Sequence, residues 1–442
     1  MEFKYHAKKL LGDSFIYGLS GIITSFIGVF LIPLYTNVFD PSDYGIIALL
    51  GSLQTIVTIF IIFGMDNSFG VWYYDNPSEA GKRITVSNWF FFSLTLGFFV
   101  ALLLVSGSYY IAKFLLGNSQ LYPLIILFAI NIFLASTQKV LNIWFRVRRK
   151  PVHAVSFNLV ISLLNIALNI LFVLKLGIGL PGIYYSVCIT SLITLIITIY
   201  ILREHLAIKY IDFKELRKML VFSLPLVPTG LIFWLMGSAT PYFINFLMHS
   251  KTEIGLYQIG ASGASLLTLA TFAFFSGFTA YALSISKEEN ARKIYAKILE
   301  YYIYIGMTCA LLLGLLAKFI LQILTNEKYI SAYIVIGILA FNIVIAGVIQ
   351  VVSLANLLAK DNKPIAKSAI YSVGVTVIGY FTLIPLLGKE GAAIAVGLGN
   401  LVTTVYVTVK AQKLYFIPYN FKRIVSFSIA CIIIYIVYLE LV

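Results

Sequence analysis

Long runs of apolar residues, separated by short polar connections, follow one another along almost the whole chain. Most runs are close to the ~20 residues that a helix needs to cross the hydrocarbon core of a bilayer. No connection exceeds about 20 residues, which leaves no extramembrane domain for a soluble catalytic site. The pattern predicts twelve spanning helices and a shorter thirteenth, at residues 15–38, 45–66, 85–106, 121–145, 153–174, 180–202, 220–247, 254–281, 296–319, 330–358, 366–387, 391–412 and 424–441.

The composition agrees with this pattern. Hydrophobic residues make up 60% of the 442 residues and charged residues only 11%, whereas a soluble domain has about 25% charged residues. Such an excess of apolar side chains cannot be buried in a water-soluble core. The sequence therefore predicts an all-α integral membrane protein and excludes two or three soluble domains.

The net charge of +14 comes from 32 Lys and Arg residues against 18 Asp and Glu residues. These cations form short clusters between apolar runs and no continuous basic face, so we expect no nucleic-acid partner. With the N-terminus in the cytoplasm, the cytoplasmic connections hold 25 Lys and Arg residues and the outer connections 6, and Lys139 alone lies within a span. This asymmetry supports the predicted spans and a cytoplasmic N-terminus.

The two halves of the chain repeat at a spacing near 210 residues. IPLYTNVFDPSDYG contains Pro33 and Gly45, and TPYFINFLMHSKTEIG contains Pro241 and Gly255. Because proline removes a backbone hydrogen bond, we interpret these four residues as hinges at equivalent places. The repeat predicts two six-helix lobes related by an axis along the membrane normal: an N-terminal lobe at 1–202, a cytoplasmic linker at 203–219, a C-terminal lobe at 220–413, and an extension at 414–442.

Small residues recur at four-residue spacing on the sixth and twelfth predicted spans. This spacing places them on one stripe of a helix, where they let neighbouring helices approach closely. We expect each stripe to be packed against another helix: Gly182, Ser186, Thr190, Thr194 and Thr198 in the first half, and Gly391, Ala395, Gly399 and Thr403 in the second.

Polar side chains form stripes on the fourth, fifth and tenth predicted spans. Amides that face lipid are costly, so these faces are expected to point inward. Two interpretations stay open: hydrogen bonding between helices, or a hydrophilic cavity that binds sugars. The stripes contain Asn131, Gln138 and Asn142; Asn158, Ser162, Asn165 and Asn169; and Asn342, Ser353 and Asn356.

Cations close the fourth predicted span at its cytoplasmic end. Lys139 lies about 9 Å along the helix from Phe145, so its side chain can either snorkel to the interface or meet an anion. Because arginine makes bidentate contacts with phosphate, we interpret Lys139, Arg146, Arg148 and Arg149 as a site for an anionic headgroup. Asp66, at a cytoplasmic helix end, is a candidate for ion coupling, with a plain solvated carboxylate as the alternative.

The sequence contains no motif for cofactor or metal chemistry. The GxGxxG match at Gly177–Gly182 lies in a turn between two spans, and GxxxxGK[ST] is absent. The three cysteines and four histidines form no metal-binding spacing and no catalytic triad. We therefore expect no cofactor, no metal, and a protein that is not an enzyme.

Several segments resemble the Wzx-type polysaccharide flippases, which belong to the superfamily of multidrug, oligosaccharidyl-lipid and polysaccharide exporters. These segments are IPLYTNVFDPSDYG, GMDNSFGVWYYDN, SLPLVPTGLIFW and EIGLYQIG, and the resemblance covers roughly residues 10 to 413. It implies two six-helix lobes around a central cavity and alternating access. Many relatives carry an arginine shortly after the aspartate that ends the second span, but here Asp66 is followed by Asn67, Ser68, Phe69, Gly70, Val71 and Trp72.

The implied cargo is an undecaprenyl-diphosphate-linked oligosaccharide, of the O-antigen or capsule type, which crosses the bacterial cytoplasmic membrane. The implied partners are the lipid bilayer, a polysaccharide polymerase and a chain-length regulator. A drug/cation antiporter of the same superfamily would need a deeply buried carboxylate. A lipid II flippase would be expected to have several cations in its first two spans, and a membrane polysaccharide polymerase a large outer loop. We find none of these features in the sequence.

Overall fold

A computed structural model describes residues 32–76, 78–286, 288–359, 361 and 363–441. The regular structure of these residues is entirely helical, which confirms the predicted fold class. Most of the first predicted span lies outside them. The chain forms two compact units: unit 1 combines Met1–Ala48 with Leu235–Val442, and unit 2 is Leu49–Trp234. Both boundaries fall inside helices, in α2 (Pro41–Ile62) and in α11 (Leu226–Met236).

Unit 2 contains the helices of the first half of the chain. Their strongest contacts join α6 to α9 and α4 to α6. After α2 they are α3 (Met65–Asp75), α4 (Glu79–Ser106), α5 (Ser108–Ile111), η1 (Ala112–Leu116), η2 (Ser119–Leu121), α6 (Tyr122–Ala135), α7 (Gln138–Val147), α8 (Pro151–Asn169), η3 (Ile170–Lys175), α9 (Leu180–Leu202), η4 (Ile208–Tyr210) and α10 (Phe213–Ser223), followed by α11.

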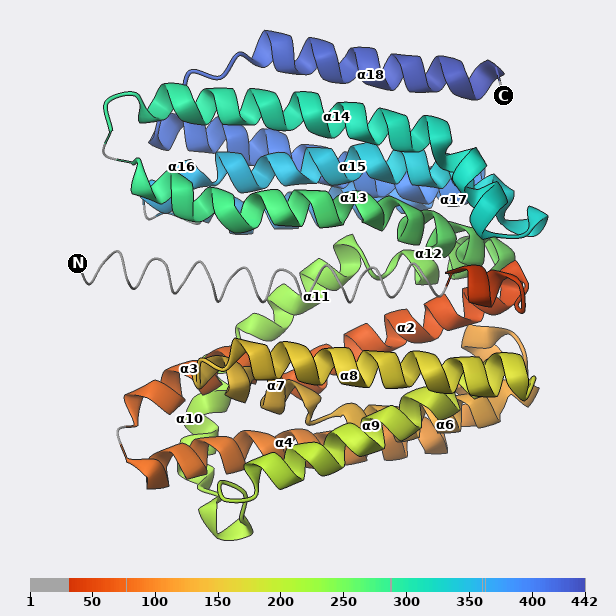
Figure 1. Cartoon of the computed structure of the whole chain (residues 1–442), viewed down its shortest axis with the longest axis vertical. Coiled ribbons are helices and arrows are strands. Elements are labelled where there is room, and N and C mark those ends of the chain that lie inside the picture. Colours follow the sequence, from red (N-terminus) through yellow and green to blue (C-terminus); the bar gives the residue numbers. More distant parts are fainter. Residues whose placement is uncertain (1–31, 77, 287, 360, 362, 442) are drawn as a thin grey trace. The chain divides into compact units, whose positions relative to one another are not determined.

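Unit 1 is built around α14 and α15, which pack against each other and against α13, α17 and α18 (Figure 1). Its core includes Tyr295, Tyr302 and Met307 of α14 and Val344 of α15. The described elements after α11 are α12 (Thr240–Met248), α13 (Lys251–Ser284), α14 (Ala291–Leu324), η5 (Glu327–Ala332), α15 (Tyr333–Val352), α16 (Leu354–Leu358), α17 (Lys363–Leu414) and α18 (Phe421–Leu441).

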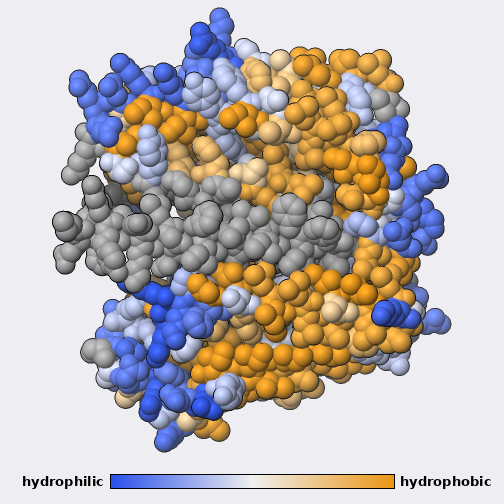
Figure 2. Space-filling view, in the orientation of Figure 1, coloured by the Kyte–Doolittle hydropathy of each residue, from blue (hydrophilic) through white to orange (hydrophobic). Residues whose placement is uncertain are grey.

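Among the described residues, nine helical stretches are long and apolar enough to cross a membrane, and the bent pair α10–α11 makes a tenth if it counts as one span. α17 is a single stretch of 52 residues in which Gly388 breaks the helix, at the place where the sequence separates two spans. Figure 2 shows hydrophobic side chains along the helices and hydrophilic ones gathered at the helix ends. The multi-pass membrane character is therefore confirmed.

The prediction of one continuous seventh helix at 220–247 is wrong. α10 ends at Ser223, α11 begins at Leu226 with a bend of 44°, and α12 begins only at Thr240. Proline explains both breaks. Pro225 cannot continue the hydrogen bonding of α10, and Pro241 occupies the first turn of α12, where its missing N–H costs nothing.

The break in α17 is held by an ion cluster. Gly388 has a φ of +58°, a conformation that favours glycine. The next residue, Lys389, donates its backbone N–H to a carboxylate oxygen of Glu253 at 3.0 Å. Its ammonium group lies 3.1 Å from Glu390 and 3.5 Å from Glu253, and only 10% of the Lys389 side chain is exposed. Glu253 thus ties the start of α13 to the break in α17.

The short thirteenth predicted span forms α18, which packs on α14. Tyr435 fits a notch made by two glycines, because a methyl group on Gly314 or Gly337 would overlap its ring. Its hydroxyl donates to the carbonyl of Ile334 at 3.2 Å, and the Tyr438 hydroxyl donates to Leu315 at 3.1 Å. α18 is therefore an integral part of unit 1.

Both small-residue stripes are buried, as predicted. On α9, the Ser186 hydroxyl donates to the carbonyl of Gly182 at 2.9 Å, so its hydrogen bond is made within the same helix. On α17, Ser372 donates to the carbonyl of Gly399 at 2.7 Å, across the break at Gly388. A side chain at Gly399 would overlap the hydroxyl of Thr376. The two arms of α17 can approach this closely because the stripe carries almost no side chain.

Candidate functional site

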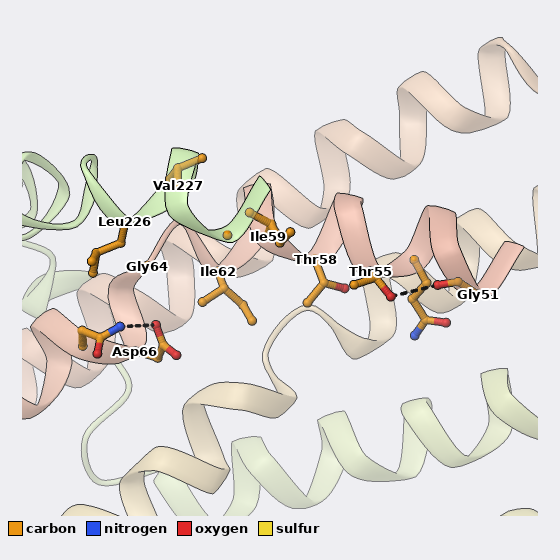
Figure 3. Close-up of a pocket in the computed structure, with 12 residues that line it drawn as sticks. Gly51, Thr55, Thr58, Ile59, Ile62, Gly64, Asp66, Leu226 and Val227 are labelled. Carbon is orange, nitrogen blue, oxygen red and sulfur yellow. Dashed lines mark hydrogen bonds between the residues drawn. The ribbon is translucent and has the colours of Figure 1, made fainter. Parts of the chain in front are cut away.

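A cavity of about 580 Å³ with one polar wall lies in unit 2, where α2 meets α3 and α11 (Figure 3). The helix breaks at this point, because Phe63 and Gly64 both have positive φ. A methyl group on Gly64 would come within 2.9 Å of the Leu226 side chain and 3.0 Å of the Ser223 carbonyl. The turn therefore allows α11 to approach closely. The cavity is lined by Gly51, Gln54, Thr55, Thr58, Ile59, Ile62, Gly64, Asp66, Asn67, Leu226, Val227 and Gly230.

Sequence reasoning overlooked the polar wall of this cavity. Gly51, Thr55 and Thr58 lie at helical spacing on one face of α2, with Gln54 beside them (Figure 3). That spacing is visible in the sequence, but threonines and a single glutamine are a weaker signal than a row of asparagines. The wall offers hydroxyl and amide groups that can hydrogen-bond a hydroxylated ligand.

Asp66 lies in the cavity, in the first turn of α3, where the helix dipole favours a negative charge. One carboxylate oxygen accepts a hydrogen bond from the Asn67 side chain at 3.2 Å. The predicted candidate for ion coupling therefore lines a cavity, and its coupling role stays a prediction.

The predicted headgroup residues lie on two different surfaces of unit 2. Lys139 and Arg146 are both exposed on α7, whereas Leu141 and Trp144, on the opposite face, are buried. The same polar face carries Gln138 and Asn142, and Asn142 accepts a hydrogen bond from Asn158 of α8 at 3.1 Å. α7 and α8 thus share a polar surface that includes two cations.

The side chain of Arg148 interacts with three neighbouring side chains of unit 2. Its guanidinium donates to the Tyr73 hydroxyl at 3.1 Å, lies 3.3 Å from Nε2 of His205, and stacks 5.0 Å from the Trp144 ring. His205 is buried, and its burial and the nearby Arg148 charge lower its pKa. Arg149 is exposed beside this cluster, with a φ of +52°.

The connections that the charge pattern places on one side of the membrane meet in unit 2. Ser87 donates to the carbonyl of His205 at 2.6 Å, and Arg83 donates to the Tyr210 hydroxyl at 3.1 Å. Asn88 exchanges two hydrogen bonds with the backbone of Asp212, at 2.9 and 3.1 Å. These contacts bring basic connections together at one end of unit 2. This arrangement supports the predicted alternation of cytoplasmic and outer connections.

Several other stripe residues form hydrogen bonds within the helix packing of unit 2. Asn165 of α8 donates to Thr190 of α9 at 3.3 Å, and Asn169 donates to Asn165 at 2.9 Å. Asn131 accepts from Ser191 at 2.8 Å. For these residues, the interpretation as hydrogen bonding between helices is the one that the geometry favours.

In unit 1, one of the predicted stripe asparagines joins helices and another is buried without a hydrogen-bond partner among the described residues. Asn342 of α15 accepts from Asn400 of α17 at 2.9 Å, and Asn356 of α16 is fully buried. These asparagines lie inside the helix packing of unit 1. The exposed polar surface shared by α7 and α8 therefore has no counterpart at these two positions.

The four predicted hinge residues lie in unit 1. Gly45 packs against the backbone of Lys251, and Gly255 packs against the backbone of Pro41 and the backbone nitrogen of Gly45. The glycines therefore allow a close helix contact. Pro33 lies in a helical stretch at 32–36, and Pro241 begins α12. The hinge role of these residues stays a prediction.

In the described part of the chain, no group of three or more His, Cys, Asp or Glu side chains is placed to hold a metal ion.

Comparison with known protein families identifies the family of this chain. The family model described as polysaccharide biosynthesis protein matches residues 37–334, which is more than half of the chain. The chain belongs to this family. No curated protein sequence matches the chain.

Solved structures show which fold this polysaccharide biosynthesis protein has. It is similar to the lipid II flippase MurJ in an inward closed conformation, with 15% identity, a TM-score of 0.75, and coverage of 96% of this chain and 93% of the other. It is also similar to an inward-facing multidrug resistance MATE family transporter of the MOP superfamily, with 16% identity, a TM-score of 0.67, and coverage of 95% and 98%. At these identities the likeness establishes the fold. The resemblance noted in the sequence is confirmed.

Proposed function

We propose that this protein is a flippase, and not an enzyme, which moves undecaprenyl-diphosphate-linked oligosaccharide repeat units across the bacterial cytoplasmic membrane by alternating access. The observation that carries the proposal is the polar surface shared by α7 and α8. It exposes Lys139 and Arg146 on a membrane-length stretch of a protein from a polysaccharide biosynthesis family.

The chemistry of this surface suits a diphosphate linked to sugars. Taking a bare anion out of water is costly, so a diphosphate needs cations along its path. Lys139 supplies a point charge and Arg146 a planar fork that can bind two phosphate oxygens. Asn142 and Asn158 offer amides to sugar hydroxyls, and the polyprenyl tail stays in the bilayer. The polymerase and chain-length regulator remain proposed partners.

The test replaces both cations of this surface. We expect Lys139→Ala with Arg146→Ala to lower flipping of a fluorescent undecaprenyl-diphosphate oligosaccharide in proteoliposomes at least tenfold, because each lost charged contact costs roughly 1.5–3 kcal/mol. The matched control is Lys113→Ala with Lys175→Ala, which also removes two cations of unit 2. Unchanged flipping in the first variant, at equal protein level, would refute the proposed site.

A second candidate function is drug/cation antiport, favoured by one observation, the carboxylate of Asp66 in the cavity beside α11. Asp66→Asn removes the charge but keeps an acceptor for Asn67. If the protein is an antiporter, this variant abolishes ion-driven efflux of a cationic dye. If it is the proposed flippase, the wild type moves no dye, and the lipid-linked substrate is the one transported.

A further inference from the structure

A second cavity, of about 910 Å³, opens in unit 1 where α18 begins beside α14. It shares no residue with the cavity at Asp66 or with the polar surface of α7 and α8. Tyr304 of α14 forms one wall, and the other wall is the start of α18 and the residue before it. The lining residues are Tyr304, Asn420, Lys422, Arg423, Ser426 and Phe427.

Within the described residues, the cations of this groove have no ion-pair partner. Lys422 and Arg423 are both exposed in the first turn of α18, where the helix dipole already makes the potential positive. No carboxylate of the described residues forms an ion pair with either cation. The nearby carboxylate of Glu300 accepts a hydrogen bond from Tyr304 at 2.7 Å. Two uncompensated cations at a positive helix end favour an anion in the groove.

The groove continues into a lipid-facing surface. Val425 and Ile429 of α18 are each 50% exposed, and Ile433 is 54% exposed. In a spanning helix, such a face lies against acyl chains. The first turn of α18 then lies at the level of the phospholipid headgroups. An anion bound here is therefore adjacent to hydrocarbon, which favours a lipid over a soluble phosphate.

We propose that this groove binds the headgroup of an anionic phospholipid of the surrounding bilayer. Arg423 and Lys422 contact the phosphate, and the hydroxyl of Ser426 and the amide of Asn420 lie beside it as hydrogen-bonding groups. The acyl chains follow the exposed apolar face of α18. Basic pockets between spanning helices bind anionic headgroups in this way. The bound lipid would stabilise α18 on α14, whatever cargo the protein carries.

The experiment compares lipids on the purified full-length protein. Thermal unfolding is followed in detergent with added phosphatidylglycerol, with phosphatidylcholine, or with inorganic phosphate. We expect phosphatidylglycerol alone to raise the Tm, because a ligand that binds only the folded state stabilises it, and the stabilisation grows with the ratio of ligand concentration to Kd. The same rise with inorganic phosphate would show a soluble-anion site and overturn the lipid proposal. The same rise with phosphatidylcholine would show that the negative charge is irrelevant.

Two variants identify the groove as the site. Lys422→Gln with Arg423→Gln should weaken phosphatidylglycerol binding at least tenfold, measured as the increase in the lipid concentration that is needed for the same rise in Tm. The matched control, Lys410→Gln with Lys413→Gln, removes two exposed cations from the end of α17 and should bind as the wild type does. Equal weakening in both variants, or in neither, would overturn the proposal.

Ser426→Trp provides a test that keeps both cations. The indole would fill the groove, so lipid binding should fall while the charge of the protein stays the same. If the double glutamine variant fails to fold, this variant decides the question. Wild-type lipid binding by Ser426→Trp would show that the cavity is not occupied by the headgroup.

Discussion

Gly45 and Gly255 pack against each other in a reciprocal contact. A methyl group on Gly45 would overlap the carbonyl of Lys251, and one on Gly255 would overlap the carbonyl of Pro41. Each glycine thus meets the residue that lies four positions before its counterpart. Such exchange of equivalent contacts is what a two-fold relationship produces. It supports the internal repeat that the sequence predicts.

This contact yields a stability prediction. Gly255→Ala should lower the free energy of unfolding by about 1–3 kcal/mol, because the new methyl group meets backbone that can move only if α2 shifts. Thermal unfolding in detergent measures the change. Gly374→Ala is the control, because no atom lies within 4 Å of the added methyl group and alanine favours the helix. Equal stability of the two variants would contradict the contact.

The predicted hinges can be tested at the prolines. Pro33→Ala with Pro241→Ala should slow flipping several-fold and leave the Tm nearly unchanged, because Pro241 occupies a first turn that tolerates either residue. Pro181→Ala, in the first turn of α9, serves as the control. Wild-type flipping in the double variant would rule out bending at these residues as part of transport.

His205 makes the stability of unit 2 depend on pH. Burial and the nearby positive charge of Arg148 lower its pKa below 6.5, with a smaller opposing effect of Glu79, and Arg83 and Glu204 also act on it. The folded state therefore binds a proton less readily than the unfolded state. The contribution of His205 is fully present above pH 6.5 and is lost as the pH falls through the lowered pKa.

The Tm should accordingly fall between about pH 7 and pH 5 in the wild type, and His205→Gln should reduce this fall. Glutamine can still accept a hydrogen bond from Arg148 but does not titrate. His153→Gln is the control, because His153 is exposed. The same pH dependence in all three proteins would show that other groups cause it.

Cysteine labelling tests the orientation that the charge pattern predicts. The structure guides the choice of sites, since Lys389 is buried in an ion cluster and Arg148 is held by Tyr73. Lys150 and Lys328 are exposed and lie on opposite predicted sides. In a background without the three native cysteines, an impermeant maleimide should label Lys328→Cys in intact cells and Lys150→Cys only after permeabilisation. The reverse pattern would invert the topology.

The sequence determined the all-α membrane fold, most spans, and the burial of both small-residue stripes. It could do so because hydropathy and residue size act locally, through lipid contact and helix spacing. The lobe boundaries at 1–202 and 220–413 remain a prediction, since the compact units divide inside α2 and α11.

Only the tertiary structure decided the helix breaks that no proline or glycine marks, and the partners of the polar side chains. The break between α6 and α7 at Ser136 and Thr137 contains neither glycine nor proline, and it packs against Gly97 of α4. Asn165 and Asn142 look alike in the sequence, yet Asn165 bonds to Thr190 of α9, whereas Asn142 bonds to Asn158 of α8 on a face that also exposes Lys139. These outcomes depend on which helix lies opposite each residue, and a residue's own neighbours in the chain do not carry that information.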